Sequence, residues 1–427
     1  MCKMNILIIG SGAREHAFCW KLAQSKKTEK IYVVPGNAGT SELAINLNFD
    51  VSRFKDLKEN LLKHNILLVL VGPEIPLING VVDQINNDKE LEHILVVGPS
   101  KKGALLEGSK DFSKEFMERH KIPTAGYKTF NTETLELGLK YLESVTSPFV
   151  LKADGPAAGK GVLILDNLED AKKELISMLK NNKFGSSGHR VVVEEFLDGI
   201  ELSCFVLTDG KSYKILPNAK DYKRIGEGDT GLNTGGMGSI SPVSFASEEF
   251  LKKVEDRIIV PTVKGLQKEN LPYKGFIFIG LIMVDNDPYV IEYNVRMGDP
   301  ETQVVLPRIK SDFLELMVRT ANQTLNNFDL RINKDTYANI VMVAGGYPES
   351  YEKGNPITGI PKDNETSKIF HAGTKKVDNK FFTNGGRVLS VVSKGSDFKK
   401  ALSKSYEITE KIDFKDKNYR KDIGFDL

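Results

Sequence analysis

The chain has 427 residues, 40% of them hydrophobic and 27% charged, which is enough for about two to four globular domains with proper cores. A formal net charge of +2 excludes a general nucleic-acid-binding or membrane-surface protein, so any phosphate site must be local. The three cysteines form no CxxC pair, and no apolar run approaches the ~18 residues of a membrane span. We therefore expect a cytoplasmic protein without a disulfide framework or a cysteine zinc site.

The first hundred residues alternate short apolar runs with helical patterns. Each of the four apolar runs ends in a Gly/Pro loop, and the runs cover residues 5–9, 31–34, 67–71 and 94–97. In an open parallel sheet such loops gather at one edge, where ligands bind. Gly10 and Gly12 permit a turn whose N–H groups face an anion at a helix N-terminus, although a purely structural turn remains an alternative. It is not a dinucleotide fingerprint, because Glu15 stands at the third glycine position.

An amphipathic helix is predicted over residues 105–120, with Ser109 as a plausible cap. Lys110 would lie in the first turn after that cap, where a cation gains nothing from the helix dipole. A phosphate partner explains a lysine at this position, and a solvated lysine is the alternative.

The segment FVLKADGPAAGKGVLIL, residues 149–165, predicts a β-hairpin with a glycine-rich tip inside a small α+β module. Lys152 lies on its first strand, and the backbone amides of the tip can close over a triphosphate while lysines neutralise it. A Walker A loop is excluded, because three residues separate the glycines of GPAAGKG and no Ser or Thr follows Lys160. A plain glycine-rich hairpin remains possible.

Residues 220–242 form the most glycine-rich segment and begin with a basic cluster of Lys220, Lys223 and Arg224. A loop of this length without an apolar period is functional or disordered. Its Met237 and Ile240 favour a folded loop against a substrate. From about residue 330, short β-runs divided by glycine-rich turns indicate a separate α+β domain.

The strand PYVIEYNVRMGDPET, residues 288–302, carries the strongest functional pattern. Alternation puts Glu292, Asn294 and Arg296 on one face. The other face receives Ile291, Tyr293 and Val295. A carboxylate and an amide oxygen beside a guanidinium suit a magnesium ion that bridges phosphates. The turn after the strand adds two carboxylates, Asp299 and Glu301, which favours this interpretation over a solvated edge strand.

These patterns together predict an enzyme that depends on ATP and magnesium. The nucleotide would lie between the glycine-rich hairpin and the Glu292 strand, and a small substrate would lie at the N-terminal sheet edge. A dehydrogenase is disfavoured because the dinucleotide fingerprint is incomplete. A nucleotide-sensing module without catalysis is the non-enzymatic alternative, and it would not need two anion-ready domains facing a third glycine-rich loop.

The motifs also resemble a known family over nearly the whole chain. E-Y-N-x-R-x-G-D-P-E-T is similar to the magnesium-binding strand of the ATP-grasp ligases, and more narrowly to that of the phosphoribosylamine–glycine ligase family. The motifs in the order expected for that family are GSGAREHA, PGNAGT, GPEIPL, LEGSKDF, KADGPAAGKGV, EEFLDGIELS, KRIGEGDTGLNTGGMG, EYNVRMGDPETQ, AGGYP, HAGT and NGGRVL.

The resemblance implies an α/β and α+β multidomain fold. An N-terminal open parallel α/β substrate domain is expected over residues 1–103. The ATP-grasp core would take residues 104–121 and 193–327, its lid residues 122–192, and a β-rich α+β domain residues 328–427. The implied reaction joins glycine to 5-phosphoribosylamine with ATP, through glycyl phosphate, in purine biosynthesis.

The resemblance also implies roles for individual residues. Glu292 and Asn294 would bind Mg²⁺ or Mn²⁺. The residues implied for ATP are Lys110, Lys152, Gly155, Gly159, Lys160, Gly161, Glu194, Glu195, Phe196, Leu197 and Glu201. The residues implied for catalysis are Lys152, Arg296, Asp221, Lys223 and Arg224. Those implied for glycine and the phosphoribosyl substrate are Gly10, Gly12, Arg14, Gly36, Asn37, Gly72, Pro73, Glu74, Asp229, Asn233, Thr234, Gly235, Gly236, Asp299 and Glu301.

The chain departs from the family pattern at three positions. Pro156 stands where Leu is expected, Lys220 where Gln is commoner and Tyr222 where His is commoner, so fine contacts rather than the reaction are in doubt. We expect a monomer that acts on small molecules, with no nucleic-acid or membrane partner. The alternative enzymes are another ATP-grasp carboxylate–amine ligase or a carboxylase of the biotin or aminoimidazole type.

Overall fold

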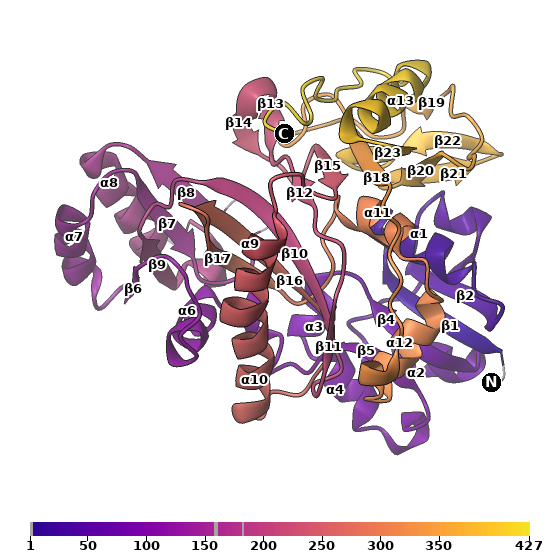
Figure 1. The fold of residues 1–427 in the computed structure, drawn as a ribbon, viewed down its shortest axis with the longest axis horizontal. Coiled ribbons are helices and arrows are strands. Elements are labelled where there is room, and N and C mark those ends of the chain that lie inside the picture. Colours follow the sequence, from indigo (N-terminus) through magenta and orange to yellow (C-terminus); the bar gives the residue numbers. More distant parts are fainter. Residues whose placement is uncertain (1–2, 158–160, 182) are drawn as a thin grey trace.

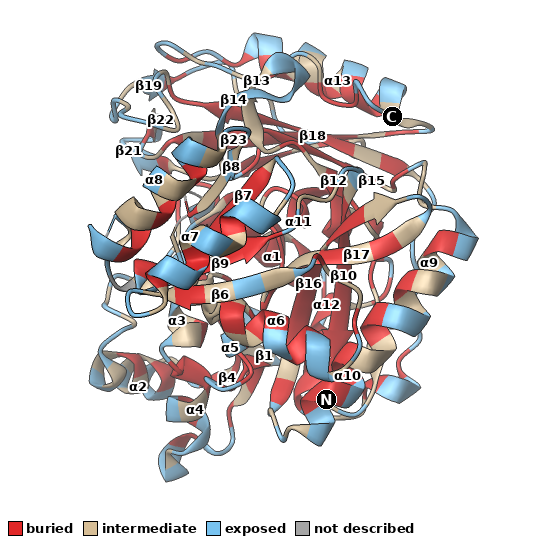
Figure 2. Cartoon of the chain, turned by 90° about the vertical axis from the view of Figure 1, so that its left-hand side faces the viewer, coloured by how far each residue is buried: buried red, intermediate tan, exposed pale blue. Residues whose placement is uncertain are grey.

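The computed structural model describes residues 3–157, 161–181 and 183–427. Figure 1 shows a broad body with a smaller lobe at one side, built from β6 to β9 with α7 and α8. Figure 2 shows that buried residues follow the central strands, whereas α7, α8, α9 and α10 keep exposed outer faces. None of the helices in the described ranges is long and apolar enough to cross a membrane.

Five parallel strands form the N-terminal part of a nine-stranded sheet, in the order β5-β4-β1-β2-β3. Alternate residues of β1 enter two different cores, with Leu7 and Ile9 in one and Ile6 and Ile8 in the other. Both faces are therefore covered, which confirms the expected open α/β sheet. The strands are β1 (Met4–Gly10), β2 (Thr28–Pro35), β3 (Ile45–Asn46), β4 (Ile66–Val71) and β5 (Leu95–Pro99), and the helices are α1 (Ala13–Leu22), α2 (Phe54–Lys63), α3 (Glu74–Ile78) and α4 (Val81–Asn86).

The same sheet continues into an antiparallel part, because β5 pairs with β16 through Gly98 and Pro99. The strands here are β10 (Ile200–Thr208), β11 (Tyr213–Ile215), β16 (Tyr273–Val284) and β17 (Asp287–Asn294). The helices are α5 (Leu105–Gly108), α6 (Lys110–Arg119), α9 (Glu248–Val254), a π-helical turn (Glu255–Ile259), α10 (Val260–Lys268), α11 (Thr302–Val305) and α12 (Phe313–Ala321). Ser109 caps α6 as predicted, its Oγ accepting from the Phe112 N–H at 3.1 Å.

The smaller lobe has a sheet and a core of its own. Its four strands run in the order β6-β9-β7-β8, and the predicted glycine-rich hairpin is confirmed as the antiparallel pair β7 and β8. Helices α7 and α8 cover one face through a separate apolar core. The elements are β6 (Tyr127–Asn131), β7 (Phe149–Ala153), β8 (Val162–Leu165), β9 (Arg190–Glu194), α7 (Leu135–Ser144) and α8 (Leu168–Lys180).

The C-terminal part is β-rich, as expected, and takes strands from an unexpected source. The segment 220–242, predicted to be a long loop, supplies β12 and β15 to the edge of the C-terminal sheet, in the order β12-β15-β18-β23-β20. It also folds into the hairpin of β13 and β14. The strands are β12 (Lys220–Asp221), β13 (Arg224–Gly226), β14 (Thr230–Asn233), β15 (Gly238–Ser241), β18 (Thr336–Val343), β19 (Pro356–Ile357), β20 (Ser367–His371), β21 (Thr374–Val377), β22 (Lys380–Thr383) and β23 (Arg387–Gly395), with helix α13 (Phe398–Lys411).

A buried pair of histidines joins the first helix to the C-terminal sheet. The His371 N–H donates to His16 Nδ1 at 2.9 Å, and Asn37 Nδ2 donates to the His371 carbonyl at 2.7 Å. Burial lowers the pKa of His16 to about 3 and that of His371 to about 4. Both rings are therefore neutral in the folded protein near neutral pH.

This contact predicts a loss of stability in acid. Between the ordinary histidine pKa of 6.5 and the lowered value of about 4, the unfolded chain binds more protons than the folded chain. The free energy of unfolding should therefore fall as the pH falls through this window. Urea unfolding at about pH 7 and about pH 4.5 should show a smaller loss for His371→Gln than for the unmodified chain. Replacement of the exposed His93 by Gln is the control, and equal losses in all three chains would contradict the prediction.

The functional strand β17 carries an irregularity that the alternation rule missed. Its pairing with β16 shifts between Gly280 and Leu281, so that Glu292 and Val290 take consecutive partners and Ile291 is bulged out. Val290 and Tyr293 enter the core, and Ile291 and Tyr293 both border a pocket. This bulge interrupts the two-residue period on which the predicted alternation of Ile291 and Glu292 rested.

Candidate active site

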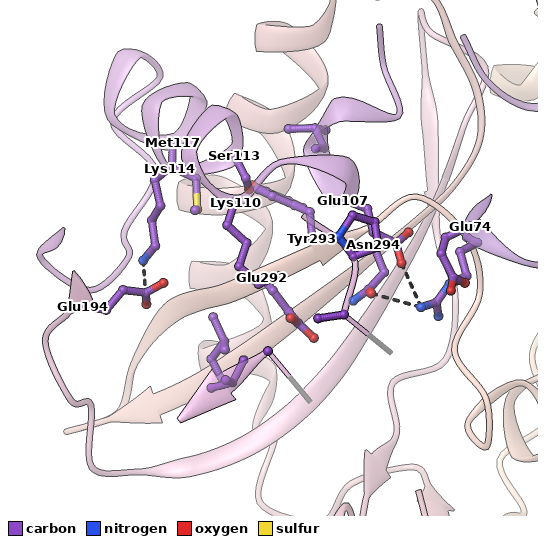
Figure 3. A pocket seen from close by; sticks show the side chains of 17 residues that line it. Glu74, Glu107, Lys110, Ser113, Lys114, Met117, Glu194, Glu292, Tyr293 and Asn294 are labelled. Carbon is purple, nitrogen blue, oxygen red and sulfur yellow. Dashed lines mark hydrogen bonds and ion pairs between the residues drawn. The ribbon is translucent and has the colours of Figure 1, made fainter. Parts of the chain in front are cut away.

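One pocket lies where the α6 helix, the hairpin of β7 and β8, and the strand β17 meet (Figure 3). Charged side chains converge on it from all sides. In the view of Figure 3, Lys110 and Glu292 extend into the same part of the pocket. The polar residues that line it include Glu107, Lys110, Lys114, Glu194, Glu292 and Asn294.

Two lysines share one carboxylate oxygen in this pocket. Lys114 Nζ lies 2.9 Å and Lys152 Nζ 3.0 Å from Glu194 Oε2, and all three side chains are buried. Burial lowers the pKa of Lys114 to about 8, although Glu194 attracts its proton. Two cations face one anion, which leaves positive charge for a second anion such as a phosphate.

Lys114 was not among the residues predicted from the sequence. It lies one helical turn after Lys110 on α6, at the spacing that puts two side chains on one face. That spacing is visible in the sequence. The sequence does not show that Lys114 reaches the pocket, because a lysine at this position on a surface helix would ordinarily be solvated.

Glu292 faces three lysines from different elements. Burial alone would raise the pKa of its carboxyl group, but the attraction of Lys223, Lys110 and Lys152 outweighs burial and lowers the pKa below its ordinary value. Glu292 is therefore an ionised carboxylate at neutral pH. An ionised carboxylate beside cations at a pocket floor suits a site for phosphate and a divalent metal.

The donor set of Glu292 and Asn294 fits a magnesium or manganese ion that takes its other ligands from phosphate and water. Magnesium is usually bound by one or two protein carboxylates together with substrate phosphates. Asn294 is buried, and among the described residues its Nδ2 has no hydrogen-bond partner, while its Oδ1 accepts a long 3.3 Å bond from Arg296. Nowhere in the described ranges do three His, Cys, Asp or Glu side chains form a metal-binding group, so an all-protein metal cage is absent there.

Arg296 anchors the end of β17. Its Nη2 lies 2.8 Å from Glu107 and its Nε 3.2 Å from Glu74. Glu107 also accepts from the Val295 N–H at 2.8 Å. Arg296 was among the residues implied for catalysis, and the structure places its guanidinium between two carboxylates at the pocket wall.

A second cluster, which we name the acidic cluster, contains Glu201, Asp221, Glu301 and Lys223. Lys223 Nζ lies 2.6 Å from Glu201, and Ser203 Oγ donates to Glu301 at 3.1 Å. Burial and the nearby Asp221 raise the pKa of Glu301 to about 8, and burial also raises the pKa of Asp221. The attraction of Glu201 and Asp221 outweighs burial and raises the pKa of Lys223. One lysine does not neutralise three crowded carboxyl groups, so a further cation such as an ammonium group would bind favourably there and would lower the raised pKa values of Glu301 and Asp221.

Two residues that were predicted for catalysis or substrate binding make their contacts outside the acidic cluster. Arg224 Nη1 donates to the Gly231 carbonyl at 2.8 Å, within the hairpin of β13 and β14. Asp229 pairs with Arg420 of the C-terminal tail. In the structure both side chains brace this hairpin rather than join the acidic cluster.

At the N-terminal sheet edge, where an anionic ligand was predicted, the structure places the carboxylate of Glu15. Glu15 is 1% exposed, and a Cβ at Gly10, Gly12 or Gly72 would lie 2.5, 2.9 or 2.0 Å from it. The Gly12 N–H donates to Glu15 Oε2, and Arg14 Nε donates to Glu15 Oε1, both at 2.6 Å. The Gly12 N–H that was predicted to face an anion is therefore already bound to Glu15.

The remaining predicted residues of this edge surround the same loops. The Asn37 amide braces them by donating to the carbonyls of Ser11 (2.9 Å) and Gly12 (3.2 Å). Gly36 adopts a positive φ of 71°, and Pro73 caps α3. Asn37 is therefore engaged within the protein.

The predicted nucleotide residues of the lobe lie around its hairpin and after β9. Gly155 and Gly161 flank the tip, where a Cβ would come within 2.8 Å of Ser187 and 2.7 Å of Ala157. Glu195, Phe196 and Leu197 follow β9 without regular structure and are exposed or half-buried. Gly159 and Lys160 lie outside the described residues.

A lysine-rich pocket between a small β-lobe and an antiparallel sheet defines the ATP-grasp class of enzymes. Family models of phosphoribosylglycinamide synthetase match three consecutive parts of the chain: the N domain at residues 4–107, the ATP-grasp (A) domain at 108–302 and the C domain at 337–426. The chain belongs to the phosphoribosylglycinamide synthetase family. This confirms the fold class and the resemblance seen in the motifs.

Individual relatives agree with this assignment. The chain is 42% identical to phosphoribosylamine–glycine ligase of Fusobacterium nucleatum, over 99% of the chain and 98% of that protein. It is 46% identical to the bifunctional purine biosynthetic protein PUR2,5 of Pichia angusta, of which it spans 54%. The crystal structure of phosphoribosylamine–glycine ligase from Thermotoga maritima matches with a TM-score of 0.84 and 36% identity, over 98% of this chain and 99% of that one.

A biotin carboxylase domain shows the wider relationship. The domain of Hydrogenobacter thermophilus 2-oxoglutarate carboxylase, in complex with MgADP and bicarbonate, has a TM-score of 0.73 at 15% identity and covers 97% of this chain and 91% of its own. At this identity the likeness concerns the fold alone.

Proposed function

We propose that the chain ligates glycine to 5-phosphoribosylamine in purine biosynthesis. ATP is consumed and the products are glycinamide ribonucleotide, ADP and phosphate. Membership of the family and near full-length relatives named phosphoribosylamine–glycine ligase support this proposal. The observation that carries it is the ionised Glu292 among three lysines from different elements.

The phosphates of ATP lie between α6 and the hairpin of the lobe. There Lys110 and Lys114, which line the pocket, and Lys152, which pairs with Glu194 of its lining, reduce the repulsion between ATP and a carboxylate substrate. Glu292 and Asn294 would hold a magnesium or manganese ion, which supplies further positive charge to the phosphates when bound. Glu195 to Leu197 frame the adenine and Glu201 holds the ribose. The lobe acts as a lid that excludes water from the reacting groups.

Glycine lies beside the acidic cluster, where Asp221 and Glu301 receive its ammonium group. A carboxylate oxygen of glycine attacks the γ-phosphorus of ATP, ADP leaves, and glycyl phosphate forms. The amine of 5-phosphoribosylamine, held at the N-terminal sheet edge, then attacks the carbonyl carbon. Phosphate leaves, the nitrogen loses a proton, and the amide is complete. Positioning and charge neutralisation suffice, and no Ser, Cys or His nucleophile is required.

An assay of ADP release tests this function. We expect turnover when ATP is offered with glycine and 5-phosphoribosylamine together, and none when either is omitted. Bicarbonate with biotin, and bicarbonate with aminoimidazole ribonucleotide, serve as the competing substrates. Turnover with one of these pairs, and none with glycine, would assign the chain to the carboxylases instead.

The organisation of the chain is also proposed. The N-terminal substrate domain takes residues 1–103, the core 104–121 and 193–327, the lid 122–192 and the C-terminal domain 328–427. The enzyme acts as a monomer on small molecules.

A further inference from the structure

The glycine-rich loop 233–236 is held by two side chains of the C-terminal part of the chain, Arg387 on β23 and Tyr347 after β18. The Gly235 N–H donates to Tyr347 Oη at 2.9 Å, and Arg387 Nη1 donates to the Gly235 carbonyl at 2.5 Å. A Cβ at Gly235 would lie 2.8 Å from Arg387 Cζ, so the guanidinium packs directly against the loop. Both main-chain polar groups of one glycine are thus bound by two distant side chains.

Arg387 also binds the turn that follows the functional strand. Its Nη1 donates to the Asp299 carbonyl at 2.7 Å and lies 3.4 Å from Asp299 Oδ1. Asp299 in turn accepts from Gln303 Nε2 at 2.8 Å. One guanidinium therefore connects the glycine loop to the turn that ends the functional strand.

The loop in turn holds the main chain at Lys223, which belongs to the acidic cluster. Thr234 donates to the Lys223 carbonyl from its N–H at 2.8 Å and from its Oγ1 at 2.7 Å. The Lys223 side chain is 40% exposed, and its Nζ lies 2.6 Å from Glu201. Because the side chain is only half covered, its place depends on the main chain that Thr234 holds.

We propose that Arg387 and Tyr347 are positioning residues that clamp the loop 233–236 and thereby hold Lys223 at the acidic cluster. Through Lys223 they act mainly on the acidic cluster, whose Glu201 is also the proposed ribose residue. The lysines of the ATP pocket lie on α6 and β7, which these two residues do not contact in the described structure. The kinetic test of this inference rests on the proposed function, because it measures the ligation of glycine.

Steady-state kinetics of Arg387→Met and Tyr347→Phe test the clamp. We expect the KM for glycine to rise by about tenfold or more in Arg387→Met and less in Tyr347→Phe, with a smaller rise in the KM for ATP because Lys223 also pairs with Glu201. Arg387→Lys should recover part of the loss, because a lysine can donate to only some of the same acceptors. Tyr351→Phe is the control, since its ring packs near Tyr347 and the described part of the chain shows no hydrogen bond from it to the loop.

Equal changes in the KM for ATP and for glycine, or an unchanged KM for glycine in Arg387→Met, would overturn the proposal. Amide hydrogen exchange separates this result from a failure of the proposed function. Faster exchange of residues 233–236 in Arg387→Met, with the C-terminal strands unchanged, supports the clamp even if the wild-type chain does not ligate glycine. Unchanged exchange of the loop would contradict it.

Discussion

Glu292→Gln should lower ATP-dependent turnover by about a thousandfold or more while the protein stays folded. The substitution keeps the shape of the side chain and removes the carboxylate charge that Lys223, Lys110 and Lys152 together stabilise. The pocket then loses the anionic ligand that a divalent cation requires. Turnover with saturating substrates, measured by ADP release, and the melting temperature by calorimetry check both parts of this expectation.

Asp287→Asn provides the matched control. Asp287 lies on the same strand and is partly exposed, pairing with Lys253 and Arg257 at the surface. Such exposed pairs contribute about 1 kcal/mol or less, so this variant should keep wild-type turnover. Wild-type activity in Glu292→Gln would show that the metal strand has been assigned wrongly.

Lys152→Met should lower kcat/KM for ATP by about a hundredfold or more. The substitution removes one of the two cations that share Glu194 and leaves the Lys114–Glu194 pair in place. The lobe should therefore stay folded, while the phosphates of ATP lose a nearby positive charge. Steady-state kinetics at varied ATP and binding of a non-hydrolysable ATP analogue measure the two effects.

Lys128→Met is the control for this variant, because Lys128 lies on β6 of the same lobe sheet and is exposed. It should bind the analogue as the unmodified chain does. An affinity of Lys152→Met for the analogue equal to that of Lys128→Met would mean that Lys152 does not face the phosphates.

Much of the fold follows from local patterns. The apolar strand ending at Ile9 and the glycine-rich hairpin after Lys152 are encoded within short windows, and both are confirmed. Long-range pairings have no local signal. Helix α12 packs Phe313 and Leu314 into the core on one face of the N-terminal sheet, and β15 joins the C-terminal sheet from the middle of the chain.

The sequence identified many of the residues of the site by their chemical type. The contacts between them could be described only from the folded structure. Glu292 could be identified because a carboxylate, an amide and a guanidinium alternate on one strand. The bulge at Ile291 could not be predicted from the sequence, because it depends on how β17 pairs with β16. Glu15 and Arg387 lie within the motifs GSGAREHA and NGGRVL, but the motifs gave neither side chain a role, since each acts on glycines that the fold brings to it.

The most direct measurement is a crystal structure with a non-hydrolysable ATP analogue and Mn²⁺, with the metal located by anomalous scattering. We expect one manganese peak in contact with both the Glu292 carboxylate and the Asn294 amide oxygen, with the γ-phosphate on its other side. A triphosphate bound elsewhere, with Glu292 and Asn294 turned away from it, would contradict the account.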